Sequence, residues 1–253
     1  EGGKGSSEIG GAVYGGNDDA DNSGTLQYIR LEYTGFAFDE EHEANGISFY
    51  GVGNGTIVDH CQAYKGSDDG FEFFGGSVNV SNLVAVSCSD DSFDWTEGWN
   101  GKGTNLVAYQ EDKSTLGYDC DCLMECDNNG SNNAATPVAH PVLKNLILVG
   151  NGGSKQGIRL RAGTEVEIDN AKVCGKGQPL TVETALTENA LKNGTSKLTN
   201  ITLTSELSSK EGIYTAVFMA ARLVLLIIGC SMMTLTTTPI QLTDGIERLL
   251  RPL

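Results

Sequence analysis

The amino-acid sequence predicts an all-β fold, a right-handed parallel β-helix with about 22–24 residues in each coil of the solenoid. Two observations predict it. A cassette of the form x-Gly-apolar-x-apolar recurs at a nearly constant interval. A second track, in which Asn precedes an apolar residue in a short strand-like run, lies between the cassettes. Two tracks with one period indicate coils that stack on each other.

The cassette repeats along most of the chain. From Asn45 to the second copy at Asp69 is 24 residues, and from there to the third copy at Asp91 is 22. Strand alternation directs the apolar positions of each copy into the core, where we expect aromatic rings of successive coils to stack. The copies are 45–49, 69–73, 91–95 and 156–160, with a degenerate fifth at 179–182.

The Asn track predicts a second set of strands, rich in β-branched and aromatic residues and bounded by Gly, Asp and Ser. Aligned asparagines at a bend can form hydrogen-bonded ladders between stacked coils. The asparagines are Asn82, Asn105, Asn145, Asn170 and Asn200. The strands are Leu26–Tyr33, Thr56–Tyr64, Val78–Val86, Thr104–Tyr109, Val142–Val149, Glu165–Val173 and Leu198–Leu203.

The chain divides into three parts. Residues 1–23 are rich in Gly and Asp and predict a flexible lead-in, and residues 24–211 carry the β-helix. From Asn105 to Asn145 is 40 residues, which predicts that an inserted loop near 110–140 protrudes from the solenoid. Long excursions from a rigid scaffold often carry function.

Residues 212–253 form an atypical hydrophobic C-terminal segment, in which 216–233 is apolar except for Arg222. Three interpretations stay open. The stretch 216–233 has about the length of a short membrane span and could anchor the protein. The segment could instead cap the open end of the solenoid, where strand edges would otherwise be exposed. It could also be an uncertain sequence that does not belong to the natural protein, because its composition differs from that of the repeat.

The composition is strongly acidic, with a net charge of −16. This charge argues against nucleic acid and anionic membranes as partners, and favours cations or basic partners. Six carboxylates lie in the cassettes and turns of two adjacent coils, so their mutual repulsion needs relief. We expect an oxygen-only site for Ca²⁺, formed by Asp68, Asp69, Glu72, Asp90, Asp91 and Asp94. The alternative is that the turn aspartates cap backbone N–H groups, while Glu72 and Asp94 point outward into solvent.

Other chemistry-bearing residues give weaker signals. The stretch 119–128 places Cys120, Cys122 and Cys126 in a polar loop, which is compatible with a disulfide, a metal site, or Ca²⁺ held by Asp119, Asp121 and Asp127. Arg159 and Arg161 point outward, to clamp an anion or to pair with nearby carboxylates. No nucleophile–histidine arrangement is evident, so no catalytic residue is assigned.

Four motifs carry a resemblance to a known family: 14–33, 45–56, 68–76 and 90–95. Together they resemble a family of secreted or cell-surface bacterial proteins of uncharacterised function, which is similar to the pectate-lyase-like right-handed parallel β-helix superfamily. The resemblance covers about residues 10–207. It implies export and a β-helix. In pectate-lyase-like enzymes Ca²⁺-binding acids work with a basic residue, and the sequence places no such base beside the acids.

We therefore expect a non-catalytic, extracellular structural or adhesive β-solenoid, located in the medium or at the cell surface. Exposed solenoid ends favour self-association into a homo-oligomer, with the chain as the repeating subunit of a filament. The alternative is a carbohydrate-binding or Ca²⁺-dependent polysaccharide lyase-like protein. Ca²⁺ is the one candidate cofactor, glycans are candidate partners, and membrane contact requires that 216–233 be a genuine anchor.

Overall fold

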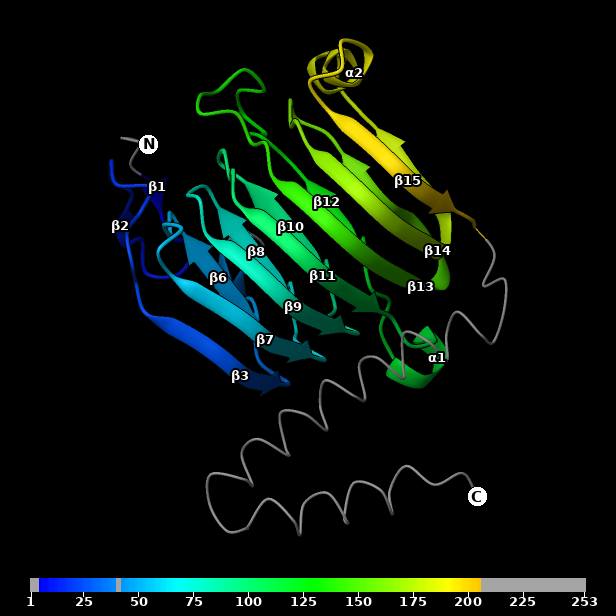
Figure 1. The fold of residues 1–253 in the computed structure, drawn as a ribbon. Coiled ribbons are helices and arrows are strands. Elements are labelled where there is room, and N and C mark those ends of the chain that lie inside the picture. The colour runs from blue at the N-terminus through cyan, green and yellow to red at the C-terminus, as the bar shows by residue number, and fades with distance from the viewer. Residues whose placement is uncertain (1–4, 40–41, 206–253) are drawn as a thin grey trace, which may run out of the picture.

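The structure is a computed structural model that describes residues 5–39 and 42–205. Its dominant element is one sheet of 11 strands that curls back on itself in the order β3-β7-β9-β11-β13-β12-β10-β8-β6, with β14 and β15 continuing from β13. Figure 1 shows the strands stacked along the long axis of the molecule in two rows. This arrangement is a right-handed parallel β-helix, and the predicted fold class is confirmed.

Each track of the sequence forms one row, and every pairing between the strands of this sheet is parallel. The Asn-track row consists of β3 (Thr25–Glu32), β7 (Ile57–Tyr64), β9 (Asn79–Val86), β11 (Lys102–Tyr109), β13 (Val142–Leu160), β14 (Glu167–Val182) and β15 (Lys197–Leu203). The cassette row consists of β6 (Ile47–Tyr50), β8 (Phe71–Phe74), β10 (Phe93–Thr96) and β12 (Met124–Cys126). Strands β13 and β14 are long enough to take part in both rows.

The remaining elements are short. Antiparallel pairs join β1 (Gly5–Ser6) to β2 (Val13–Tyr14) and β4 (Ala37–Asp39) to β5 (His42–Glu43). Helix α1 (Lys113–Leu116) begins after Asp112, whose side chain accepts the N–H of Ser114, and helix α2 (Ala185–Lys192) ends at Asn193. No helix in the described ranges is both long enough and apolar enough to cross a membrane.

The core is a column of rings between the two rows, as strand alternation predicts. Phe49 stacks on Phe73 with ring centroids 4.9 Å apart, and Phe71 stacks on Phe93 at 5.5 Å. Phe73 continues onto Trp99 at 4.0 Å, while Trp95 tilts against Trp99 rather than stacking on Phe73. The rings are almost fully buried, and burial of this apolar area is the main stabilising term of the fold.

The predicted asparagine ladder is confirmed over four coils. Asn105 donates to Asn82, Asn145 to Asn105 and Asn170 to Asn145, at 2.9, 3.0 and 2.9 Å. Each of these residues has a φ between +54° and +63°, so the ladder also holds a left-handed backbone bend in every coil. Asn200 instead donates to Asp169 at 2.8 Å, and His60 and Tyr28 occupy the equivalent bend at the other end.

One part of the predicted organisation is wrong. The sequence analysis placed the three cysteines in a protruding loop, but β12 pairs with β10 on one side and β13 on the other. Residues 122–126 are therefore a further copy of the cassette, in which Leu123 replaces the usual Gly. The coils on either side of it are 31 and 34 residues long. Their extra length lies in the turn segments between the strands and not in the stretch with the cysteines.

The other domain boundaries stay predictions. Residues 5–23 run along the first coils, where the N–H groups of Asn54 and Gly55 donate to the carbonyl oxygens of Asp19 and Asp21 at 2.7 and 3.1 Å. The segment 212–253, with its three interpretations, lies outside the described residues.

We predict that Asn105→Ala lowers the free energy of unfolding by about 2–3 kcal/mol, because it removes two ladder hydrogen bonds and leaves a Cβ residue at positive φ without compensation. Asn105→Gly loses the same hydrogen bonds but relieves the backbone strain. The glycine variant should therefore be more stable than the alanine variant by about 1 kcal/mol. Urea unfolding of the three proteins measures this, and equal stability of all three would contradict a structural role for the ladder.

Candidate functional site

Stacking in register turns the acidic positions of successive cassettes into columns on one outer face of the solenoid. The best defined column follows the pairing of the cassette strands. Glu72 is aligned with Asp94, Asp94 with Glu125, and Glu125 with Arg159. Glu72 and Asp94 therefore lie one above the other in adjacent coils. Neighbouring carboxylates in such a column are only one strand spacing apart, about 4.8 Å.

A second column lies at the turn before each cassette strand. The carboxylate Oδ1 of Asp69 accepts the backbone N–H of Asp91 at 2.8 Å, and Oδ1 of Asp91 accepts the N–H of Cys122 at 2.5 Å. The turn aspartates therefore do cap backbone groups, as the alternative interpretation expected, and the N–H groups that they cap belong to the next coil. Each carboxylate retains further lone pairs for another ligand.

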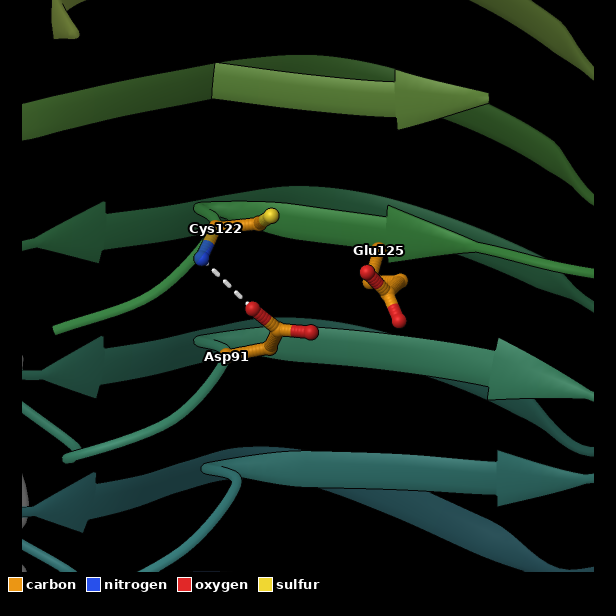
Figure 2. Close-up of side chains that lie close together, drawn as sticks. All are labelled: Asp91, Cys122 and Glu125. Carbon is orange, nitrogen blue, oxygen red and sulfur yellow. Dashed lines mark hydrogen bonds between the residues drawn. The ribbon is translucent and has the colours of Figure 1, made fainter. Parts of the chain in front are cut away.

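Among the residues that the structure describes, the two columns and the adjacent turn residues form four groups in which three possible ligand atoms lie within 4.8 Å of one another. All six predicted ligands occur in these groups. One group, Asp91, Cys122 and Glu125, is drawn in Figure 2, where side chains from two consecutive coils point into the same space. The other groups are Asp69, Glu72 and Asp94; Asp69, Asp90 and Asp91; and Glu43, Asp68 and Asp90.

The carboxylates are more buried than the sequence analysis expected. Glu72, predicted to point outward into solvent, is only 7 % exposed, and Asp69 and Asp91 are 5 % and 4 % exposed. The reason is that Asn45 lies over the column and donates to Glu72 Oε2 at 2.5 Å, while Asn45 also reaches Glu8 of the N-terminal segment at 3.3 Å. The alternative of a solvated pair is therefore wrong for Glu72, whereas Asp94 is half-buried.

Burial next to like charges makes ionisation costly. Burial and neighbouring carboxylates raise the pKa of Asp68 to about 7 and the pKa of Asp90 to about 6. The same causes, burial first, raise the pKa values of Asp69, Glu72, Asp91 and Asp94 well above the ordinary range. Each shift can be reversed by a cation that replaces the proton.

The donor set fits a hard divalent cation. Within the described part of the chain, Asp94 Oδ1 and Asn45 Oδ1 are buried oxygen atoms without a hydrogen-bond partner. Buried polar atoms of this kind are normally satisfied, so these two oxygens are available to a ligand. Carboxylate and amide oxygens are the ligands that Ca²⁺ prefers, and Asp69, Glu72 and Asp94 with Asn45 would supply them.

Basic residues lie at one end of the acidic columns, and of these only Lys155 was not singled out from the sequence. Lys155 Nζ lies 2.7 Å from Asp121, Arg159 contacts Glu125 at 2.8 Å and Glu183 at 3.1 Å, and Arg161 contacts Asp127 at 2.8 Å. These ion pairs raise the pKa of Arg159, first through its hydrogen bond to Glu183. The expectation that the arginines pair with nearby carboxylates is confirmed.

An aromatic surface lies at the opposite end of the columns. Tyr50 stacks on Phe74 with centroids 4.5 Å apart, and Tyr14 lies 5.1 Å from Tyr50. These three rings, together with Glu97 and Pro137, line part of a cavity of about 420 Å³ between the N-terminal segment and the first coils. Rings beside a polar cavity are a surface on which a sugar can stack.

The structure bears on the three interpretations of the cysteine-rich stretch. Cys120, Cys122 and Cys126 are buried free thiols in the described structure. Asp119, Asp121 and Asp127 do not converge, because they contact Asn151, Lys155 and Arg161 respectively. Only Cys122 joins a candidate metal group.

Sequence reasoning missed Glu43, Glu125 and the covering Asn45 as site residues, and it considered Cys122 only with the other cysteines, apart from the acidic positions. The signal for Glu125 was present, since Met124-Glu125-Cys126 has the apolar-acid-apolar pattern of 71–73 and 93–95. The longer coils around it hid this match. Glu43 belongs to β5, outside the repeat, so periodicity could not reveal it.

Comparison with known proteins identifies the domain but not an activity. A family model described as a pectate-lyase-like β-helix domain matches residues 1–229. No solved structure matches the chain.

Short stretches match the energy-coupling factor transporter transmembrane protein EcfT. The relative from Clostridium kluyveri is 67 % identical over 43 residues, which is 17 % of this chain and 16 % of that protein. The relative from Thermosediminibacter oceani is 62 % identical over 42 residues, with the same shares of the two chains. The match thus spans about one sixth of the length of these relatives.

We predict that the melting temperature in EDTA decreases between about pH 5 and pH 8. Folding raises the pKa of Asp68 from 3.8 to about 7 and that of Asp90 from 3.8 to about 6, so the folded state binds protons that the unfolded chain has lost. This stabilisation is complete below about pH 4 and is lost as the pH rises through 6 and 7. Differential scanning calorimetry across this range measures the slope.

Asp68→Asn should flatten the slope because the amide does not titrate. Asp18→Asn is the matched control, since Asp18 is exposed and accepts only a local N–H of Ala20 at 3.0 Å. A melting temperature that rises steadily over the same pH range would contradict the raised pKa values.

Proposed function

The chain belongs to the pectate-lyase-like β-helix family, and we propose that it is a non-catalytic structural or adhesive β-solenoid of this family that binds Ca²⁺ in its acidic columns. The observation that carries the proposal is the group of the buried Asp69 and Glu72 with the half-buried Asp94, whose oxygens lie within 4.8 Å of one another. Three carboxylates this close cannot all ionise near neutral pH without a counter-charge.

No basic residue of the described chain forms an ion pair with this group, and the charge of Arg161 offsets only part of the rise in the pKa of Asp94. Arg159 and Arg161 are engaged with Glu125, Asp127 and Glu183, one coil or more away. A cation held between Asp69, Glu72 and Asp94 would replace the protons and join two successive coils. The site would then stabilise the solenoid, in the way that bound metal stabilises a folded state.

The non-catalytic part of the proposal is supported by the state of the arginines. A polysaccharide lyase needs a basic group that can accept a proton near neutral pH. Arg159 and Arg161 are each bound to two carboxylates, which stabilise their charged forms. Neither is therefore suited to act as a general base.

Self-association is supported by the two ends of the Asn-track row. In the described residues β3 pairs only with β7, and β15 only with β14. Strand edges of this kind accept further strands. Tyr28 of β3 and Asn200 of β15 share the same positive φ, 57° and 54°, so β15 of one copy has a backbone shape that can extend β3 of the next.

We propose a cell-surface or secreted location for this solenoid, with membrane contact only through 216–233.

Glycan binding is the second candidate function, and the observation that favours it is the aromatic cavity of Tyr14, Tyr50 and Phe74 beside the acidic columns. An adhesive solenoid at the cell surface could use the cation site for its stability and this cavity for glycan binding.

We predict that Ca²⁺ at about pH 7.5 raises the melting temperature by roughly 5–10 °C relative to EDTA, as expected for a ligand well above its dissociation constant. Asp94→Asn should do two things. It removes a repelling charge, so the protein in EDTA becomes more stable, and it removes a ligand, so the Ca²⁺-induced shift becomes smaller. Thermal unfolding with and without Ca²⁺ measures both effects.

Asp18→Asn serves again as the control and should leave the Ca²⁺ shift unchanged. Equal melting temperatures of the wild type in EDTA and in Ca²⁺ would reject the cation site. Release of unsaturated products from an acidic polysaccharide by the wild type would favour the lyase alternative over the non-catalytic role.

We predict that the purified protein assembles end to end as its concentration rises, because the open edges of β3 and β15 are complementary. Negative-stain microscopy and light scattering over a concentration series would detect filaments or short chains of subunits. Monodisperse single particles at every concentration, with and without Ca²⁺, would rule out the filament.

A further inference from the structure

Lys176 is the one lysine of the described chain that is completely buried, with 0 % of its surface exposed. It lies in β14, directly opposite Gly153 of β13. No carboxylate of the described residues forms an ion pair with it. Its Nζ instead donates to two neutral oxygens, the carbonyl of Cys120 at 3.1 Å and Oδ1 of Asn151 at 3.4 Å. Burial lowers the pKa of Lys176, which favours the neutral, nucleophilic amine.

The side-chain amide of Asn151 is held next to this amine. Since Nζ is 3.4 Å from Oδ1, the amide carbon Cγ is no further from Nζ than about 4.6 Å. The oxygen also accepts the backbone N–H of Gly153 at 3.1 Å, which polarises the carbonyl and would stabilise a negative charge on it. On its other side the amide nitrogen Nδ2 donates to Asp119 Oδ1 at 2.9 Å.

The three functional groups converge over Gly153. A Cβ atom placed on this glycine would lie 2.9 Å from Asn151 Oδ1, 3.6 Å from Asp119 Oδ1 and 3.8 Å from Lys176 Nζ. The absence of a side chain at this position thus leaves room for the amine to approach the amide. The register of β13 and β14 is irregular between Val149 and Gln156, and this irregularity places Asn151 beside the lysine.

We propose that Lys176 and Asn151 form an intramolecular isopeptide bond that joins β14 covalently to β13. The arrangement provides a nucleophile, an amide electrophile, an N–H donor for the oxygen and a carboxylate at the leaving nitrogen. Such a bond needs neither a cofactor nor an oxidant, and it does not depend on the acidic columns or on a bound cation.

In the reaction the lone pair of the neutral Lys176 amine attacks Cγ of Asn151, and the electrons of the carbonyl move to Oδ1 beside the Gly153 N–H. Asp119 takes a proton from the attacking nitrogen and delivers it to Nδ2. The Cγ–Nδ2 bond then breaks, ammonia leaves, and the Asp119 carboxylate is regenerated. The Asp119 side chain is 45 % exposed, which gives ammonia a path to solvent.

The bond would connect residues 25 positions apart in adjacent coils. It would restrict the unfolded chain as any cross-link does and would resist separation of the two coils under load. Loss of the bond should lower the melting temperature by roughly 10 °C.

Intact-mass spectrometry of the full chain tests the proposal. We expect the wild type to be lighter than its sequence mass by one molecule of ammonia. Peptide mapping should then yield a branched peptide that contains both Asn151 and Lys176. Lys176→Met, Asp119→Asn and Asn151→Ala should each retain the full sequence mass. Lys172→Met is the matched control, because Lys172 is exposed on the same strand, and this variant should still lose ammonia.

Asn151 precedes Gly152, so closure to a succinimide would also release ammonia. Hydroxylamine opens a succinimide but leaves an isopeptide bond intact, and Lys176→Met would not prevent succinimide formation. An ammonia-depleted species that hydroxylamine converts to a hydroxamate or cleaves after residue 151, or an ammonia loss that persists in Lys176→Met, would overturn the proposal. A wild type with its full sequence mass would overturn it as well. Far-ultraviolet circular dichroism of each variant checks that the β-helix has formed.

Discussion

The parallel register between coils is the constraint on which the rest of the structure depends. It places the same position of each coil directly above its counterpart, about 4.8 Å away. Apolar positions become the ring column of Phe49, Phe71, Phe73 and Phe93, and the asparagine positions become a hydrogen-bonded ladder. Acidic positions become columns of like charge by the same geometry. The same register therefore produces both the main stabilising contacts of the fold and its main electrostatic repulsion.

The repulsion between aligned carboxylates is compensated in two different ways along the columns. At the end of the columns that contains Glu125 and Asp127, arginines from the next coil form ion pairs with these two carboxylates. At Asp69, Glu72 and Asp94, no basic side chain of the described residues forms an ion pair with the carboxylates, and Asn45 covers the buried Glu72. This contrast is why we place a cation at the second group and not at the first. The account requires that the charge be compensated locally, because buried like charges are poorly screened by salt.

Much of the fold was predictable because its signal repeats. The cassettes at 69–73 and 91–95 and the asparagines of the ladder are local patterns with a fixed period, and each was found where the sequence placed it. The burial of Glu72 was not predictable, since Asn45 and Glu8 cover it from segments outside the strict repeat. Glu125 was missed, and Cys122 was not connected to the acidic positions, because coils of 31 and 34 residues break the period. The meeting of Lys176 with Asn151 depends on an irregular pairing that no sequence pattern marks.

The central claim, that a divalent cation occupies the acidic columns, can be tested most directly by a crystal structure of the protein grown with Tb³⁺ as a Ca²⁺ substitute. The anomalous signal of Tb³⁺ locates the ion without reference to side-chain density. The account predicts a peak bonded to oxygens of Asp69, Glu72 and Asp94. Ordered carboxylates with no peak among them, or a peak only at surface carboxylates elsewhere, would contradict it.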